Sequence, residues 1–299
     1  MSRLIIIGNG FDRAHDLHTS YEHFREYLIK YKDPSICETL EQYLPPDVLW
    51  KDFEHALGEL NDEQLHDDNS CYLISYGADN WHDSYHHDYQ YMIEQTLSFA
   101  DDIPEYLGDW IRSIDMNKPP VFPTDLINPS NKFISFNYTN TLEHIYGIPH
   151  KNIFYIHGFA LDGNNLIAGH HDESLFEEPP RPVFASPEEE ALYYENYDED
   201  VRITEANEII RRYYGATYKD TTSIANANLR YFEALSDVDE VYIIGHSLSD
   251  IDFEYFELIK KHVEAESEWN ISYHTEDDYD NACVFVDALG LNNYHIFKT

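Results

Sequence analysis

Cysteine is rare in this chain, and its placement excludes the structures that depend on it. The 299 residues include only Cys37, Cys71 and Cys283, and no two of these form a Cys-x-x-Cys pair. This spacing argues against a zinc ribbon and against a disulfide framework. We expect the three cysteines to be ordinary core or surface thiols.

Basic residues are also scarce. Lys and Arg number 19 against 57 Asp and Glu, which gives a net charge of -38. A field of this sign repels phosphate backbones at long range, so it disfavours a nuclease or a general nucleic-acid binder. We expect no nucleic-acid partner. Three interpretations of the acidity stay open: high solubility, a salt-rich or crowded host, and mimicry of DNA.

The chain also lacks long apolar runs. None approaches the roughly 18 residues of a membrane-spanning helix. Residues 1–3 lead directly into a four-residue apolar run, which is too short for the core of a signal peptide. We therefore expect a cytoplasmic protein with no membrane partner. The hydrophobic fraction of 42% and the aromatic fraction of 15% indicate a folded globular protein.

Short apolar runs alternate with helical patterns along the chain. The continuous aliphatic run 4–7, closed by Gly8, is typical of a strand buried on both sheet faces. Further strands are predicted over 133–136, 153–156, 241–244 and near Ile271, the last of the chain. Helices are predicted over 20–31, 48–60, 85–114 with a bend at Pro104, 139–146, 223–235 and 252–263. This alternation predicts a single α/β domain over 1–299, a Rossmann-like parallel sheet with helices on both faces.

Two segments interrupt this pattern. The helical stretches within 35–118 predict a helical insertion lobe, with a polar break over 62–70. Residues 175–220 are acidic and rich in tyrosine, and they predict an insertion or a lid.

The first strand ends in a glycine-rich turn. In open parallel sheets, ligands bind beyond the carboxyl ends of the strands. Gly8, Asn9 and Gly10 there form either a phosphate-binding loop, because glycine lets backbone N–H groups approach an anion, or a plain tight turn. Arg13 replaces the third glycine of the dinucleotide fingerprint, which argues against a conventional dehydrogenase site and favours a variant loop. Asp12 is either a turn or cap residue or a contact to a ribose or reacting centre.

Three later strand ends carry polar side chains. Asn137 can orient a water or hold a sugar hydroxyl, and it can equally cap the next helix. His157 is either a general base, with Gly158 leaving space beside it, or a buried structural histidine. After the 241–244 strand, Gly245 precedes Ser247, which either contacts a phosphate or ribose or caps the loop. The second glycine of a serine-hydrolase elbow is missing there.

The remaining histidines give weak metal signals. His82 and His86 have i, i+4 spacing, which can hold a metal on a helix. No His-Glu-x-x-His motif accompanies them, and neighbouring aspartates make a solvated helix face the better interpretation, so we expect no metal. A loop around His170 and His171 is expected to border the nucleotide site.

Five segments in a fixed order together resemble the bacteriophage abortive infection AbiH family over nearly the whole chain. The same order is distantly similar to the sirtuin-like NAD-hydrolase domains of phage defence. The segments are LIIIGNGFD at 4–12, TSYEHF at 19–24, SFNYTNTLE at 135–143, IHG at 156–158 and IIGHSLSD at 243–250.

The resemblance implies a defence effector that binds NAD, as substrate or ligand, and hydrolyses its nicotinamide–ribose bond. It implies that the first glycine loop holds the NAD phosphates, that Asn137 and His157 are catalytic, and that Gly245 to Ser247 is the late Gly-x-Ser loop. The chain departs from the pattern where Thr139 replaces an aspartate, for which Asp12 or Asn140 can substitute. The sirtuin zinc cysteines are absent, which argues against protein deacylation.

Two other functions stay open. A nucleotide-binding sensor or regulatory subunit without turnover is favoured by the Thr139 departure. An interaction protein would use the charge of -38 to occupy a basic partner. Beyond a small nucleotide, the partners that we expect are a protein partner or phage trigger, and a second copy of the chain in a homo-oligomer.

Overall fold

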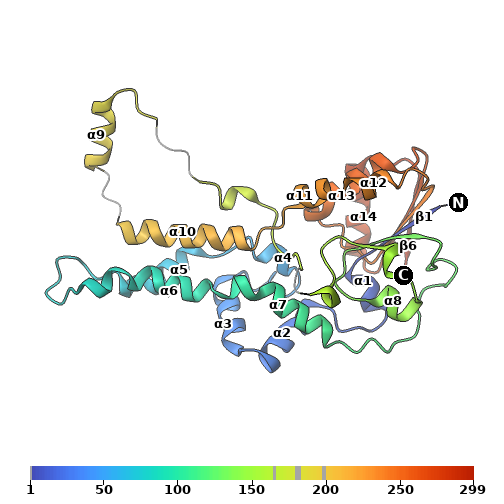
Figure 1. Cartoon of the computed structure of the whole chain (residues 1–299), viewed down its shortest axis with the longest axis horizontal. Coiled ribbons are helices and arrows are strands. Elements are labelled where there is room, and N and C mark those ends of the chain that lie inside the picture. The colour runs from blue at the N-terminus through green and yellow to red at the C-terminus, as the bar shows by residue number, and fades with distance from the viewer. Residues whose placement is uncertain (1, 164–165, 179–182, 197–199) are drawn as a thin grey trace. The chain divides into compact units, whose positions relative to one another are not determined.

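A computed structural model describes residues 2–163, 166–178, 183–196 and 200–299 (Figure 1). The strands are β1 (Arg3–Ile7), β2 (Lys132–Ser135), β3 (Ile153–Tyr155), β4 (Glu240–Ile244), β5 (Glu268–Tyr273) and β6 (Tyr294–Lys298). The helices are α1 (Asn9–Ala14), α2 (Tyr21–Tyr31), α3 (Pro34–Tyr43), α4 (Phe53–Ala56), α5 (Asp62–Asn69), α6 (Asp88–Leu97), α7 (Phe99–Arg112), α8 (Thr141–Tyr146), α9 (Pro187–Asn196), α10 (Val201–Ala216), α11 (Thr221–Ala227), α12 (Leu229–Glu233), α13 (Phe253–His262) and α14 (Glu276–Leu289).

The chain divides into two compact units. The first contains Met1–Lys32, Pro104–Ala168 and Lys219–Thr299, and it holds the whole sheet. The second contains Asp33–Ile103 and Gly169–Tyr218 and is helical. None of the helices in the described ranges has the length and apolar character needed to cross a membrane.

The sheet has six parallel strands in the order β3-β2-β1-β4-β5-β6. This is the strand order of Rossmann-type dinucleotide-binding sheets. In the register, Ile5 of β1 lies between Phe133 of β2 and Tyr242 of β4. The predicted α/β class and the Rossmann-like parallel sheet are therefore confirmed.

The aliphatic run of β1 is buried because helices cover both faces of the sheet. Leu4 and Ile6 join the core that α13 and α14 cover, whereas Ile5 and Ile7 join the core that contains Phe11 of α1. These four side chains are at most 1% exposed. Burying each contributes about 1.5–3 kcal/mol, which explains why no polar residue interrupts the run.

The predicted helices and strands differ from the observed ones in several places. The predicted polar break over 62–70 is wrong, because α5 forms there, with the Asn61 side chain accepting from Gln64 N and Leu65 buried. The helix predicted over 48–60 shortens to α4 between turns. Ile271 does not lie in the last strand, since α14 and β6 follow it.

The 85–114 helix is two helices. α6 ends at Leu97 and α7 begins at Phe99, with Pro104 inside α7 rather than at the break. Proline cannot donate the internal helix hydrogen bond, and the first compact unit resumes at this residue.

In the second unit, α6 and α10 lie side by side (Figure 1). Polar contacts join them, including Gln90 Nε2 to Glu205 Oε2 at 2.6 Å and the exposed ion pair of Arg212 with Glu94 at 3.2 Å. Tyr213 is buried, and its hydroxyl donates to Leu57 O. The segments predicted as a lobe (35–118) and as an acidic insertion (175–220) both contribute residues to this unit, and the lid role remains a prediction.

Candidate functional site

The carboxyl ends of four neighbouring strands carry the residues that the sequence singled out. Chain connections leave β1 toward β2 and leave β4 toward β5, so the order reverses between β1 and β4. Ligands of open parallel sheets bind at such a switch point. Gly8 follows β1 there, and Gly245 follows β4.

The two glycine loops contact each other backbone to backbone. Gly8 N donates to Ile244 O at 3.1 Å, and Gly10 N donates to Gly245 O at 2.7 Å. A Cβ on Gly8 would lie 2.6 Å from the Cα of His246, which is closer than real Cβ atoms come. The sequence suggested that these amides bind a phosphate, but they are hydrogen-bonded to the end of β4. Asn9, between the two glycines, is exposed.

Asn137 is fixed against the first loop. Its Nδ2 donates to Gly8 O at 2.9 Å, and its backbone N donates to Ser135 Oγ at 3.2 Å. The side chain is buried. It does not cap the next helix, because α8 has Asn140 as its N-cap. Asn137 therefore joins the ends of β1 and β2, next to the switch point.

Asp12 is a buried carboxylate held by two threonine hydroxyls. Thr139 Oγ1 donates to Asp12 Oδ2 at 2.7 Å, and Thr141 Oγ1 donates to Oδ1 at 2.6 Å. Burial raises the pKa of Asp12 to about 6, although hydrogen bonds from Thr139, Thr141 and Asn137 oppose the shift. Thr139, which replaces the aspartate expected from the resemblance, thus donates to a carboxylate from a different strand end.

Asp12→Asn is expected to remove a pH dependence of stability. The raised pKa means that the folded chain keeps a proton which the unfolded chain releases above about pH 4. Stability from this group is therefore full below about pH 4 and is lost as the pH rises through 6, by roughly 3 kcal/mol. Urea unfolding at several pH values should show that wild type loses this stability relative to Asp12→Asn.

A second variant should enlarge the pH dependence of stability instead of removing it. Thr141→Val removes one donor to Asp12, so it should raise the pKa of that carboxyl further and extend the loss to higher pH. Parallel stability curves for wild type and Asp12→Asn would show that Asp12 ionises as it does in the unfolded chain.

A second buried cluster lies beyond the ends of β3 and β4. The carboxylate of Asp252 accepts from Lys219 Nζ at 2.9 Å, and His246 Nε2 lies 3.3 Å from its other oxygen. Lys219 is 1% exposed. Burial alone would raise the pKa of Asp252, but the Lys219 ammonium and the imidazoles of His157 and His246 outweigh it and hold that pKa well below its usual range.

The hydrogen bonds define the His246 tautomer. Leu248 N donates to His246 Nδ1 at 2.9 Å, so Nδ1 is the accepting nitrogen. The proton is then on Nε2, which faces the Asp252 carboxylate. Asp252 therefore orients His246 as well as neutralising Lys219.

His157 belongs to this second cluster. Its Nε2 lies 3.5 Å from Asp252 Oδ1 but has no hydrogen-bond partner in the part of the chain that the structure describes. Burial and the nearby Lys219 ammonium hold the pKa of His157 well below its ordinary value, against the pull of Asp252. The ring is thus neutral at physiological pH, and it packs edge-on against Phe136. The burial of His157 fits a structural histidine, and its neutral ring fits a general base, so both interpretations stay open.

The late loop exposes one hydroxyl. Ser247 is exposed, and the following Leu248 has a left-handed backbone with φ of 59°. The next short helix, Asp250–Asp252, has Ser249 as its N-cap, so Ser247 does not cap it. Gly158, after His157, also has a positive φ of 93°.

The other predicted histidines have local roles. His82 precedes a short 3₁₀ helix, Asp83–His86, and accepts from Ser84 N, so the solvated α-helix face that we expected for His82 and His86 does not form. His170 is buried in the second unit with Nε2 2.9 Å from Tyr214 O. No group of three His, Cys, Asp or Glu side chains within the described ranges is arranged to hold a metal ion.

Sequence reasoning missed Lys219, His246 and Thr141, and it took Asp252 only as a helix start. A lysine is normally exposed, so nothing in its neighbours identifies Lys219 as buried. The one sequence signal for this buried cluster was Asp252, an acidic residue shortly after the end of β4.

The chain was compared with known proteins. The comparison with curated proteins and that with solved structures gave no match. The family model described as bacteriophage abortive infection AbiH matches residues 4–273, from β1 through β5 and including every strand end of the site. The resemblance to sirtuin-like domains remains a prediction. The chain therefore belongs to the bacteriophage abortive infection AbiH family, and its role lies in abortive infection.

Proposed function

We propose that this protein binds NAD or a related nucleotide at the carboxyl edge of β1 to β4 and hydrolyses its nicotinamide–ribose bond. The strand order carries the proposal, because its switch point lies between the loops that begin at Gly8 and Gly245. Asn137 follows β2 and His157 follows β3, on the β1 side of that point.

The chemistry asks little of the protein beyond position and charge. Cleavage of a glycosidic bond passes through an oxocarbenium-like state, which a nearby carboxylate stabilises. Asp12 supplies a carboxylate that is mostly ionised at neutral pH, because its pKa is about 6. Asn137 would hold the attacking water or a ribose hydroxyl.

His157 would take the proton from that water. Its neutral ring has one nitrogen without a hydrogen bond, as a base requires. Because the ring is only 3% exposed, nucleotide or trigger binding must open this part of the site first. Activity is therefore best tested both alone and with an extract of phage-infected cells.

Purified full-length protein should release nicotinamide from NAD, measured by chromatography. Asn137→Ala and His157→Ala should each lower the rate by about 100-fold, the usual effect of losing a general base or a positioning group. Asn152→Ala, at a half-buried position, and His150→Ala, at an exposed one, make the same chemical changes outside the site and should keep the rate. Equal rates for wild type and both site variants, with all proteins folded, would refute the assignment.

A sensor without turnover is the second candidate. Both oxygens of Asp12 are already hydrogen-bonded by threonines, and His157 is enclosed, as in a site that binds without reacting. Calorimetry with NAD, ADP-ribose and ATP separates the two functions. Tight binding without nicotinamide release in infected-cell extract would support the sensor.

A further inference from the structure

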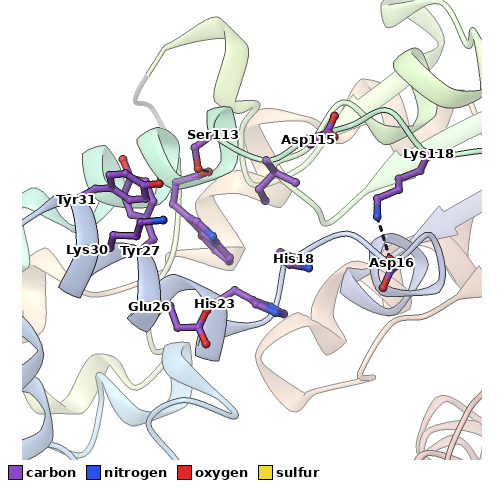
Figure 2. Close-up of a pocket in the computed structure, with 12 residues that line it drawn as sticks. Asp16, His18, His23, Glu26, Tyr27, Lys30, Tyr31, Ser113, Asp115 and Lys118 are labelled. Carbon is purple, nitrogen blue, oxygen red and sulfur yellow. Dashed lines mark hydrogen bonds and ion pairs between the residues drawn. The ribbon is translucent and has the colours of Figure 1, made fainter.

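A pocket of about 390 Å³ lies in the first compact unit (Figure 2). The loop after α1, the helix α2, and the end of α7 with the segment after it line this pocket. None of the nucleotide-site residues lines it. Its volume falls within the range of sites for small molecules, about 300–1,000 Å³.

Aromatic rings form much of its wall. The rings of His18 and His23 stack, with centroids 4.4 Å apart and planes 10° apart. Ser20 Oγ lies 2.7 Å from His23 Nδ1 and fixes that ring. Trp110 is 4% exposed and packs on the Phe24 ring, so it is a rigid part of the wall. Planar faces of this kind select a planar ligand.

The charges in the pocket favour a cation. It is lined by the carboxylates of Asp16, Glu26 and Asp115 and by only two ammonium groups. One of these, that of Lys118, is paired with Asp16 at 2.9 Å. The pocket therefore has one carboxylate more than it has ammonium groups, in a chain whose net charge is -38. The local excess of carboxylate therefore disfavours an anion in this pocket.

The second ammonium group, that of Lys30, makes a cation–π contact with a ring of the pocket wall. Lys30 Nζ lies over the ring of Tyr31, 4.8 Å from its centroid. Cations bind to the faces of aromatic rings by this attraction. Tyr31 is 60% exposed, so a ligand can reach the same ring.

We propose that this pocket binds a small planar cation, a nitrogen heteroaromatic with a positive charge. Its ring stacks on the aromatic wall, and its charge is held by Glu26 and the face of Tyr31. The site is separate from the proposed nucleotide site and does not depend on NAD hydrolysis.

Three probes test the charge preference on one ring. 1-Methylnicotinamide is a planar cation, nicotinamide is its neutral analogue, and nicotinate is an anion. Calorimetric or NMR titration of the full chain should give the cation the tightest binding, by about two- to fivefold over nicotinamide, and nicotinate the weakest. Equal affinities, tighter binding of nicotinate, or no binding of the cation up to about 10 mM would each overturn the proposal.

Variants on α2 should move the affinity in opposite directions. Glu26→Gln should weaken cation binding about two- to fivefold while leaving nicotinamide unchanged. Lys30→Met removes the competing ammonium and should strengthen cation binding, a gain that misfolding cannot produce. Glu22→Gln makes the same change as Glu26→Gln on the exposed surface of α2, outside the pocket, and should have no effect. If Lys30→Met weakens binding, the cation does not use the Tyr31 face, and the proposal fails.

Discussion

Asp252→Ala is expected to lower the free energy of unfolding by about 3–5 kcal/mol, because it leaves a buried ammonium without its partner. Lys219 is 1% exposed and its Nζ lies 2.9 Å from the Asp252 carboxylate. The same change removes the group that His246 Nε2 faces at 3.3 Å. Urea unfolding followed by circular dichroism measures the loss as a lower midpoint.

The double variant shows that the loss comes from the pair. Lys219→Met alone should also destabilise the chain, since it leaves the buried Asp252 carboxylate without its ammonium partner. Together with Asp252→Ala, it should cost less than the sum of the two single changes, with a coupling of about 2–3 kcal/mol. Glu94→Gln breaks the exposed ion pair with Arg212 and should cost at most about 0.5 kcal/mol. Additive single effects would mean that the two groups do not interact.

The sheet could be predicted because its strands are buried on both faces. Burial of this kind selects an uninterrupted apolar run, as at 4–7, where all four side chains are at most 1% exposed. β6 was missed because Tyr294 and His295 are exposed and no apolar run marks it. α5 was missed because its composition is polar, and its cap, Asn61, has the same residue type as many loop positions.

Only those residues of the candidate site that a nearby sequence pattern marks could be predicted. Asn137 and His157 could be selected because each ends an apolar run, and the carboxyl ends of parallel strands share an edge. Lys219 and Asp252 are 33 residues apart, and only the packing of the helices between them brings them together. A sequence gives no distance for such a pair.

The role of the glycine loop could not be read from the sequence for a related reason. A glycine that faces a ligand and one that faces another backbone have the same local pattern. Gly10 faces another backbone, because its N–H donates to Gly245 O, and Gly245 lies more than 230 residues away in the chain. Only the structure shows this backbone contact.

Gly245→Ala is expected to lower the free energy of unfolding by about 2–5 kcal/mol, from two causes. Gly245 has a φ of 65°, a left-handed conformation that costs a residue with a Cβ about 1–2 kcal/mol. The new Cβ would also overlap Phe11 N and lie 2.7 Å from the Cα of Gly10, and such crowding costs about 1–3 kcal/mol more.

Gly147→Ala separates the two causes. Gly147 has nearly the same φ, 68°, but nothing lies within 4 Å of a Cβ built there, so this variant should lose only the about 1–2 kcal/mol of the backbone term. The difference between the two variants is then the cost of accommodating the Cβ between the two loops. Equal losses would mean that the loops separate easily. A large difference would mean that the ends of β1 and β4 are held at one distance, so that any nucleotide bound at the switch point meets a fixed edge.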